Sequence, residues 1–391
     1  MAKKDKLQTG NKMANSVLQV THKLNHVISL SADSIAENKR LPEELVRDLI
    51  ASGMFQLLLP KRMGGRQLDL PEYLSVIENI ARADGSTAWC LNQNNVLTTF
   101  AGVMPKYLAD EIWSKNNNIL ANGPPVSVHV VPAEGGYRLT GEWRLSSGFA
   151  HATWLLALIP GDNPLAEANI DINKQYMVIP KSQAEPVDDW HVGGLRGTGS
   201  NSFKVKNLFV PEDRAFIDKG KSSEKGSLQG ISRELLFASG FASVALGISR
   251  ASLDETIEIT TQKTPQDQSL LRDQEFVQHQ IGYAEALWKS AKSFAKESIA
   301  DLLNNEKIGS RLPKDINIQV RLASTHAIRT SAMIVDIAYN LCGSHAVYES
   351  SPIHRRFQDI HAITQQIQGR MTHYVTAGKY FMGIEDEDGL L

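Results

Sequence analysis

Two neighbouring hydroxyls and a glycine stand at the end of an alternating segment near the middle of the chain. Ser146, Ser147 and Gly148 follow Trp143-Arg-Leu directly. A serine hydroxyl both donates and accepts hydrogen bonds, and a glycine lets a planar ligand approach the backbone. These properties match the edge of a flavin ring, where donors and acceptors alternate. A simple strand-to-turn transition is the alternative, because Ser-Ser-Gly is also common turn chemistry.

Three histidines are the candidates for proton transfer. His129 and His151 flank this segment, and His373 lies near the end of the sequence. Imidazole titrates near neutral pH, so each of the three is a candidate general base. A structural role is the alternative for each of them.

A polar cluster follows a tryptophan in the first third of the chain. Trp89 precedes Asn92, Gln93, Asn94 and Asn95 on a segment that is predicted to be helical. Amide side chains beside an indole suit the wall of a substrate pocket, so Trp89 and Asn92 are candidate substrate contacts. Exposure to solvent is the alternative for the asparagines.

The segment before the serines predicts the strand that positions them. Tyr137, Leu139, Trp143 and Leu145 fall on one side of it, and polar residues alternate with them on the other side. This period of two is the signature of a half-buried strand. The two serines are therefore expected at the end of a strand whose inner face packs against a core.

Residues 1–118 are predicted to form a helical N-terminal domain. Pro42 stands at a plausible first helical position, and Gly53 is well placed to end that helix. Pro71 opens a second helix with an apolar face. Residues 119–222 instead hold short apolar and alternating runs between Pro and Gly clusters, which predict a central β domain.

Residues 223–391 are predicted to form a bundle of long helices. Between Val277 and Leu302, apolar residues recur at steps of three and four. This spacing indicates a helix that packs against other helices along a continuous seam. The predicted organisation is α+β, with helices first, a sheet domain second and helices again at the end.

Composition is that of an ordinary soluble globular protein. The 391 residues are 42% hydrophobic and 21% charged, and 41 Lys and Arg against 43 Asp and Glu give a net charge of −2, which favours neither nucleic acid nor a membrane. Two distant cysteines, Cys90 and Cys342, favour a reducing cytoplasm over a disulfide framework, and no signal peptide is predicted. No metal site is predicted, because no ligand spacing accompanies His345, His354 and His361.

Seven short motifs resemble the acyl-CoA dehydrogenase superfamily, in the family order and over nearly the full length. They are Leu41-Pro-Glu-Glu-Leu-Val, Leu59-Pro-Lys-Arg-Met-Gly-Gly, Ala81-Arg-Ala-Asp-Gly-Ser-Thr-Ala-Trp, Trp143-Arg-Leu-Ser-Ser-Gly, Gly194-Leu-Arg-Gly-Thr-Gly-Ser, Val210-Pro-Glu-Asp-Arg and Arg355-Arg-Phe-Gln-Asp-Ile. The resemblance implies a helical N-terminal domain, a central β-barrel-like domain and a C-terminal four-helix bundle. It also implies a homotetramer.

Within this superfamily, the Ala-Asp-Gly-Ser-Thr-Ala-Trp and Ser-Ser-Gly motifs resemble the two-component flavin monooxygenases. The resemblance implies that a separate reductase supplies reduced FMN or FAD. Reaction with molecular oxygen then gives a C4a-hydroperoxide, which oxygenates a small substrate that is aromatic or bears a heteroatom. The resemblance places Trp143, Ser146, Ser147 and Gly148 at the flavin ring, with Ser147 or its neighbour as the contact to N5.

The resemblance also brings a glycine-rich loop to the flavin. The sequence Gly193-Gly-Leu-Arg-Gly-Thr-Gly-Ser holds three candidates for the pyrimidine edge or the phosphate, namely Arg196, Thr198 and Ser200. A plain β-turn is the alternative. No strand-turn-helix unit follows the loop, so a Rossmann site is not expected.

Neither family position for a dehydrogenase base holds a carboxylate here. The first position lies eight residues past Asp359, at Ile367. The second aligns near Phe237, with Glu234 one turn away. Isoleucine and phenylalanine cannot accept a proton, so α,β-dehydrogenation of an acyl thioester is the lesser alternative. A non-catalytic helical assembly module is a further alternative.

The histidine that many of the monooxygenases carry is also replaced. It lies seven residues past Asp359, where this chain has Gln366. A glutamine amide forms hydrogen bonds but takes no proton near neutral pH, so Gln365 and Gln366 are candidates to position a substrate. His373 competes with them as the residue that faces the substrate.

Overall fold

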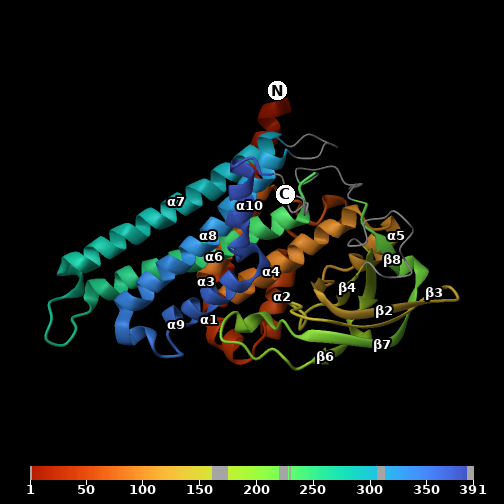
Figure 1. The fold of residues 1–391 in the computed structure, drawn as a ribbon, viewed down its shortest axis with the longest axis horizontal. Coiled ribbons are helices and arrows are strands. Elements are labelled where there is room, and N and C mark those ends of the chain that lie inside the picture. The colour runs from red at the N-terminus through yellow and green to blue at the C-terminus, as the bar shows by residue number, and fades with distance from the viewer. Residues whose placement is uncertain (1, 161–174, 220–227, 229, 306–312, 385–391) are drawn as a thin grey trace.

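The structure is a computed structural model that describes residues 2–160, 175–219, 228, 230–305 and 313–384. Helices come first along the chain, two sheets follow, and long helices come last. Figure 1 shows the strands gathered at one end of the molecule, while α6, α7 and α8 extend side by side toward the other end. This is the predicted order of helices, sheet and helices.

The N-terminal part is helical, as predicted. It comprises α1 (Ala2–Glu37), α2 (Glu43–Ala51), α3 (Leu70–Ala83), α4 (Gly85–Thr98) and α5 (Lys106–Ile112), with the 3-10 turns η1 (Met54–Gln56), η2 (Lys61–Met63) and η3 (Thr99–Gly102). Pro42 directly precedes α2, and Gly53 ends its turn with a φ of 71°. Helix α4 is almost completely buried, so its asparagines face protein and not solvent.

The strands form two four-stranded sheets. The first has the order β1 (Leu120–Gly123), β4 (Trp154–Ile159), β5 (Gln175–Pro180), β8 (Ala215–Ile217). The second has the order β2 (Pro125–Ala133), β3 (Gly136–Trp143), β7 (Ser202–Pro211), β6 (Glu185–Val187). Within the described strands, β1 and β4 pair in parallel and the other pairs are antiparallel.

One apolar core joins the two sheets, and a second core joins the first sheet to the helices. Leu155 and Ile179 of the first sheet pack with Leu139 and Phe203 of the second. On its other face, the first sheet packs against a cluster that includes Leu108 of α5. The predicted barrel-like domain is therefore a pair of stacked sheets, one of which is covered by helices.

Strand β3 alternates as predicted up to its last residue. Leu139 and Trp143 are buried on its inner side, while Arg138 and Thr140 are exposed. Leu145 does not continue this pattern, since it has a φ of 52° and a side chain that is 59% exposed. The strand ends at Trp143 because the chain turns sharply there to enter the segment with the two serines.

The C-terminal part consists of the helices α6 (Arg233–Gln262), α7 (Glu275–Asn305), α8 (Lys314–Cys342), α9 (Pro352–Gln365) and α10 (Thr372–Phe381). The predicted seam of α7 is confirmed, because Val277, Ala284 and Leu302 are buried. Among the described residues, α6 is the one helix that is long and apolar enough to span a membrane, yet 94% of its apolar window is buried inside the protein. Its apolar character therefore belongs to the core of the bundle.

The exact domain boundaries stay predictions. The helices of the first part end at Ile112 and the first strand begins at Leu120, on either side of the predicted boundary after residue 118. The second predicted boundary, between residues 222 and 223, lies outside the described residues.

Candidate functional site

The residues predicted to hold a flavin ring come together where two loops meet helix α4. Ser147 stands in the turn after β3, while Thr198 and Ser200 stand in the loop around η6 (Arg196–Thr198). The hydroxyl oxygens of Ser147 and Ser200 are 2.8 Å apart, and those of Ser200 and Thr198 are 2.7 Å apart. From α4, the indole N–H of Trp89 donates to the Ser147 hydroxyl at 3.0 Å. We call these four residues the hydroxyl cluster.

Backbone hydrogen bonds hold the two loops against each other. The Gly148 N–H donates to the Thr198 carbonyl at 2.9 Å, and the Ser146 N–H donates to the Asn201 carbonyl at 3.3 Å. Gly148 has a φ of +79°, and a Cβ there would lie 2.8 Å from the Asn94 side-chain oxygen, so the turn requires glycine. The Ser146 hydroxyl is buried and has no hydrogen-bond partner within the described chain.

The glycines of the second loop allow it to pack closely between helices. A Cβ on Gly194 would lie 2.0 Å from the carbonyl oxygen of Gln358 in α9. A Cβ on Gly197 would lie 2.0 Å from a methyl carbon of Ile35 in α1. Because helices from both ends of the chain confine this loop, they also fix the positions of Thr198 and Ser200.

Arg196 lies in the same loop, but its backbone and side chain serve different purposes. Its carbonyl accepts a hydrogen bond from the Trp190 indole N–H at 2.9 Å. The Nε of its guanidinium is buried and has no partner among the residues described. Arg196 therefore keeps at least one donor for an anionic or carbonyl group, and its assignment to the flavin stays a prediction.

Two buried carboxyl groups lie behind this loop. Asp359 of α9 accepts a hydrogen bond from the Leu195 N–H at 2.5 Å, and Asp84 caps α4 by accepting from the Thr87 N–H at 2.6 Å. Burial, and then the charge of Asp84, raise the pKa of Asp359 to about 7. Burial also raises the pKa of Asp84. Sequence motifs placed Asp359 in the family pattern but did not indicate this contact.

His151 lies beside the turn that carries Ser147. Its Nε2 is 3.1 Å from the side-chain oxygen of Asn94, and its ring packs against Phe55 with centroids 5.2 Å apart. The Asn94 amide nitrogen donates to the Leu120 carbonyl at 3.0 Å, so its oxygen faces the histidine and Nε2 must carry the proton. Burial, and then the nearby Lys181 ammonium, lower the pKa of His151 to about 3. His151 is therefore a neutral imidazole at physiological pH.

His373 lies in the bundle, at the start of α10. The Thr325 hydroxyl donates its only proton to the Gln368 carbonyl at 2.9 Å, so His373 Nδ1 must donate to the Thr325 oxygen at 2.8 Å. Its Nε2 is then left with a lone pair. Burial, and then the Arg321 charge, lower the pKa of His373. No hydrogen bond or ring contact within the described chain joins His373 to the hydroxyl cluster.

Trp143 and His129 have very different surroundings in the central β domain. Trp143 is fully buried, stacks on Phe203 with ring centroids 5.1 Å apart, and donates its indole N–H to the Leu158 carbonyl at 3.0 Å. It therefore supports the strand from within the sheet core and has no free face for a flavin. His129 is exposed on β2, on the side opposite to the buried Val130, and its role as a base beside the ring stays a prediction.

Asn92 packs between helices instead of lining a pocket. Its side-chain oxygen accepts from the Tyr73 hydroxyl at 2.7 Å, and a Cβ on Gly240 of α6 would lie only 1.8 Å from that oxygen. The amide is thus enclosed by α3 and α6. The Asn92 amide nitrogen is buried and has no hydrogen-bond partner in the described chain, so a contact between Asn92 and a substrate stays a prediction.

The two glutamines after α9 form a local turn. The Gln366 side-chain oxygen accepts from the Gln368 N–H at 2.7 Å and so begins η10 (Ile367–Gly369). Gln365 is exposed, and its amide donates to the Thr364 hydroxyl at 3.0 Å. Their predicted contact with a substrate stays untested, but the side chain of Gln366 already has a structural role.

A column of aromatic rings leads away from the hydroxyl cluster. The ring of Phe241 stacks on Trp89 with centroids 3.9 Å apart, and Phe237 stacks on Phe241 at 6.0 Å. Phe241 was not among the predicted site residues, although Phe237 and Phe241 are four residues apart on one face of a predicted helix. These three stacked rings form an apolar wall that begins at Trp89, next to Ser147.

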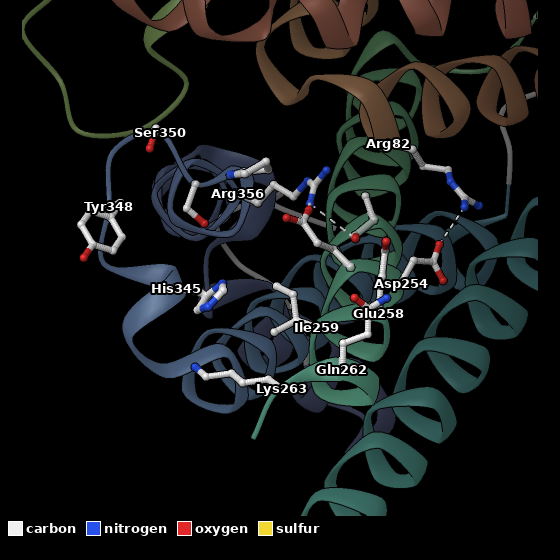
Figure 2. Close-up of a pocket in the computed structure, with 14 residues that line it drawn as sticks. Arg82, Asp254, Glu258, Ile259, Gln262, Lys263, His345, Tyr348, Ser350 and Arg356 are labelled. Carbon is white, nitrogen blue, oxygen red and sulfur yellow. Dashed lines mark hydrogen bonds and ion pairs between the residues drawn. The ribbon is translucent and has the colours of Figure 1, made fainter. Parts of the chain in front are cut away.

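A cleft of about 1080 Å³ lies elsewhere, between the second half of α6 and the start of α9 (Figure 2). In Figure 2, Arg82 points toward Asp254, to which it donates at 2.7 Å, and Arg356 pairs with Glu255. Lys263 donates to the Cys342 carbonyl at 2.8 Å. Most of the cations in this cleft are thus already paired, and the cleft shares no residue with the hydroxyl cluster.

Comparison with known proteins identifies the family. Residues 19–103 match the acyl-CoA dehydrogenase N-terminal domain, and residues 239–369 match the C-terminal domain. Indole-3-acetate monooxygenase from Pseudomonas putida is 31% identical over 92% of this chain and 94% of its own length. The HsaA monooxygenase from Mycobacterium tuberculosis has the same fold, with a TM-score of 0.86, 24% identity and coverage of 97% of this chain and 100% of that one.

A further solved structure has the same fold with bound small molecules. TdsC from Paenibacillus sp. A11-2, in complex with FMN and indole, has a TM-score of 0.81 and is 19% identical, over 95% of this chain and 98% of that one. The relatives that match over most of their own length are named as monooxygenases or hydroxylases. HsaA is named as the oxygenase subunit of a flavin-dependent monooxygenase, and the p-hydroxyphenylacetate 3-hydroxylase as an oxygenase component. The chain belongs to the acyl-CoA dehydrogenase superfamily, in its branch of flavin-dependent monooxygenases that work with a separate flavin reductase.

Proposed function

We propose that this monooxygenase oxygenates an electron-rich aromatic substrate of the indole type. When bound, reduced flavin supplies two electrons, so that one atom of O₂ enters the substrate and the other leaves as water. The observation that carries the proposal is the aromatic column of Trp89, Phe241 and Phe237, which begins at the hydroxyl cluster. The name of the Pseudomonas putida relative, which acts on indole-3-acetate, and the indole in the TdsC structure support the same substrate class.

The aromatic column suits a flat bicyclic ring. Aromatic pairs gain about 0.5–1.5 kcal/mol beyond the burial of their area, and they prefer offset stacking or edge-to-face packing. Phe237 is only partly buried, so the column keeps an accessible face at its far end.

The side chains available for proton transfer favour a substrate that is already nucleophilic. A phenol must lose a proton before it attacks an electrophilic oxygen efficiently, whereas the indole ring attacks through its own π-electrons. Gln366 replaces the histidine that would accept a phenol proton, and its side chain holds a turn. His151 is neutral and donates through Nε2 to Asn94, and its pKa of about 3 makes the remaining lone pair on Nδ1 a weak base. These features support indole over phenol.

The hydroxyl cluster and its surroundings fit a flavin ring. The buried Ser146 hydroxyl lacks a partner in the described chain, and the Arg196 Nε lacks one as well. Each of these groups would be satisfied by a carbonyl or ring nitrogen of a flavin. Gly148 lets a planar ring approach the backbone. In this arrangement, the serines and Arg196 orient the ring, and the aromatic column excludes water from it.

We also propose a homotetramer that uses reduced FMN or FAD in the cytoplasm. Exposed apolar side chains gather near the C-terminal end of the described chain, at Ile367, Met371, Val375, Phe381 and Met382. Such a stripe is unfavourable in water and would be covered by a neighbouring subunit. Both cysteines are free and buried, which suits a reducing compartment.

A desaturating dehydrogenase is the weaker alternative. Phe237 occupies one family position of the base, and Glu234, one turn before it, is exposed in the first turn of α6. Ile367, at the other position, is 53% exposed and cannot accept a proton. A carboxylate base must reach the α-carbon of a bound acyl chain, and an exposed glutamate at a helix end lacks the enclosed environment that this step uses.

The proposal is tested with purified protein, a flavin reductase, each flavin in turn, and isotopically labelled O₂. The substrates are indole, indole-3-acetate and p-hydroxyphenylacetate. We expect one labelled oxygen atom in the indole-type product, and mostly hydrogen peroxide with the phenol. The variant Phe237→Leu should raise KM for indole by ~3–10-fold through loss of stacking, while Phe294→Leu on α7 serves as the matched control.

Three results would contradict the proposal. The phenol could be oxygenated as efficiently as the indoles, which would require a base that we have not assigned. Alternatively, an acyl-CoA could bleach the oxidised flavin without oxygen, which would establish dehydrogenation instead. Peroxide formation with every aromatic compound would also exclude the proposed substrate class.

A further inference from the structure

The hydrogen bonds of the hydroxyl cluster run in one direction, and a backbone carbonyl sets that direction. The Thr198 hydroxyl lies 2.9 Å from the Leu195 carbonyl oxygen. A carbonyl only accepts hydrogen bonds, so Thr198 must be the donor. A hydroxyl has one proton, and that of Thr198 is therefore no longer available to Ser200.

The same reasoning orients the next two hydroxyls. Ser200 lies 2.7 Å from the Thr198 oxygen and must donate to it, because the Thr198 proton points to Leu195. Ser147 lies 2.8 Å from the Ser200 oxygen and must in turn donate to it. The Trp89 indole N–H, which can only donate, completes the chain at the Ser147 oxygen.

Burial keeps this direction fixed. The side chains of Thr198, Ser200 and Ser147 are 2%, 3% and 7% exposed, so water has little access to replace any of the hydrogen bonds. Reversing one hydroxyl would leave a buried donor or acceptor without a partner, which is unfavourable. Ser147 therefore has its proton engaged by Ser200 and one lone pair engaged by Trp89. Toward a ligand it can only accept.

We infer that Ser200 and Thr198 are positioning residues, which hold Ser147 as a hydrogen-bond acceptor for an N–H group of the bound ring. The inference rests on the proposed function, because the ring in question is the flavin. Reduced flavin carries a proton on N5 and can donate to Ser147. Oxidised flavin has a bare N5 that requires a donor, which the hydroxyl cluster does not provide at this position. The cluster thus favours the reduced flavin over the oxidised one.

Because the hydrogen bonds run in one direction, the residues of the hydroxyl cluster should respond differently to substitution. Removing the Ser200 hydroxyl releases the Ser147 proton, which can then turn toward an oxidised ring. Removing the Thr198 hydroxyl releases the Ser200 proton, which allows the Ser147–Ser200 hydrogen bond to reverse or to exchange. Removing the Trp89 N–H leaves the Ser147 hydroxyl donating to Ser200, so the preference for reduced flavin should stay.

The test is equilibrium binding, with no turnover. Dissociation constants are measured for oxidised FMN and FAD in air, and for the chemically reduced flavins without oxygen. The variants are Ser200→Ala, Thr198→Val and Trp89→Phe, and circular dichroism with thermal melting confirms that each is folded. The quantity of interest is the ratio of the oxidised to the reduced dissociation constant. One hydrogen bond in a buried site changes such a ratio by roughly tenfold.

We expect this ratio to fall by about tenfold in Ser200→Ala and to fall in the same direction in Thr198→Val. Trp89→Phe should keep the wild-type ratio, even if both affinities decrease, because phenylalanine preserves an aromatic ring against Phe241. An unchanged ratio in folded Ser200→Ala, or an equal fall in Trp89→Phe, would overturn the inference. A wild-type protein that binds neither flavin would instead refute the proposed function itself.

Discussion

The Asp359 carboxylate accepts a hydrogen bond from the backbone N–H of Leu195 at 2.5 Å, and this contact joins the C-terminal bundle to the loop of the hydroxyl cluster. Leu195 has a left-handed backbone with a φ of 51°, and its carbonyl is the group that orients Thr198. Asp359 therefore holds the peptide group that joins Gly194 to Leu195. The carbonyl of Leu195 in turn sets the direction of the hydrogen bonds between the hydroxyls. Asp359 thus links the bundle to the loop of the hydroxyl cluster.

The first prediction concerns the pH dependence of stability in Asp359→Asn. The pKa of Asp359 is raised from 3.8 to about 7, so the folded protein binds a proton that the unfolded chain releases between these values. Its contribution to the free energy of unfolding therefore falls as pH rises from ~4 to ~7, by roughly 1.4 kcal/mol for each pH unit. Asparagine keeps the oxygen that accepts from Leu195 but does not titrate. The stability of the variant relative to wild type should rise over this pH range.

Urea unfolding at a series of pH values measures this difference. Above pH ~7 the difference should become constant, because Asp359 is then charged in both states. Asp359→Ala serves as the comparison, since it also loses the oxygen and should weaken flavin binding at every pH. A difference between Asp359→Asn and wild type that does not vary with pH would contradict the raised pKa.

The second prediction concerns Gly194→Ala. A Cβ at this position would lie 2.0 Å from the Gln358 carbonyl oxygen, so backbone must move on one side. Overpacking of this kind typically costs about 1–3 kcal/mol. We expect lower thermal stability together with weaker flavin binding, because the displaced loop carries Thr198 and Ser200.

Gly193→Ala is the matched control for that substitution. Its Cβ would lie 3.2 Å from the side-chain oxygen of Gln358, which is the flexible end of a long side chain and can move aside. The melting temperature and the flavin affinity of this variant should stay close to those of wild type. Equal losses in the two variants would show that packing against Gln358 does not position the loop.

The third prediction concerns the histidines. With an indole-type substrate, His129→Ala and His373→Ala should retain turnover within a few-fold of wild type, because the substrate needs no deprotonation. His151→Gln should do the same if the protein stays folded, since His151 is neutral with a pKa of about 3. General acid–base catalysis contributes ~10²–10⁴-fold. A loss of that size in His373→Ala would assign proton transfer to its free Nε2.

The fourth prediction concerns assembly. Val375→Glu places a charge in the middle of the exposed apolar stripe at the C-terminal end, where Val375 is 59% exposed. We expect light scattering to report a smaller particle than the tetramer that we propose for the wild-type protein. Val131→Glu, at an exposed valine on β2, should leave the mass unchanged. A monomeric wild-type protein would contradict the proposed assembly.

The order of the secondary structure could be predicted because it depends on local periodicity. Alternation before Trp143 predicted β3, and steps of three and four between Val277 and Leu302 predicted α7. The group of Ser146, Ser147 and Gly148 was recognisable because hydroxyls beside a glycine form a short motif. Periodicity failed at Leu145, where the backbone adopts a positive φ that no alternating pattern indicates.

The tertiary structure alone decided which of the candidate side chains act together. Ser147 and Ser200 are separated by 53 positions in the sequence, and their hydroxyls meet because two loops pack between helices from both ends of the chain. The stacking of the two sheets buried Trp143 in their core, and His129 faces solvent on β2. The direction of the hydrogen bonds also depends on residues that are distant in the sequence. Each hydroxyl donates to the acceptor that the fold places next to it. The sequence by itself determined the elements and the family motifs, whereas contacts over long separations determined the site.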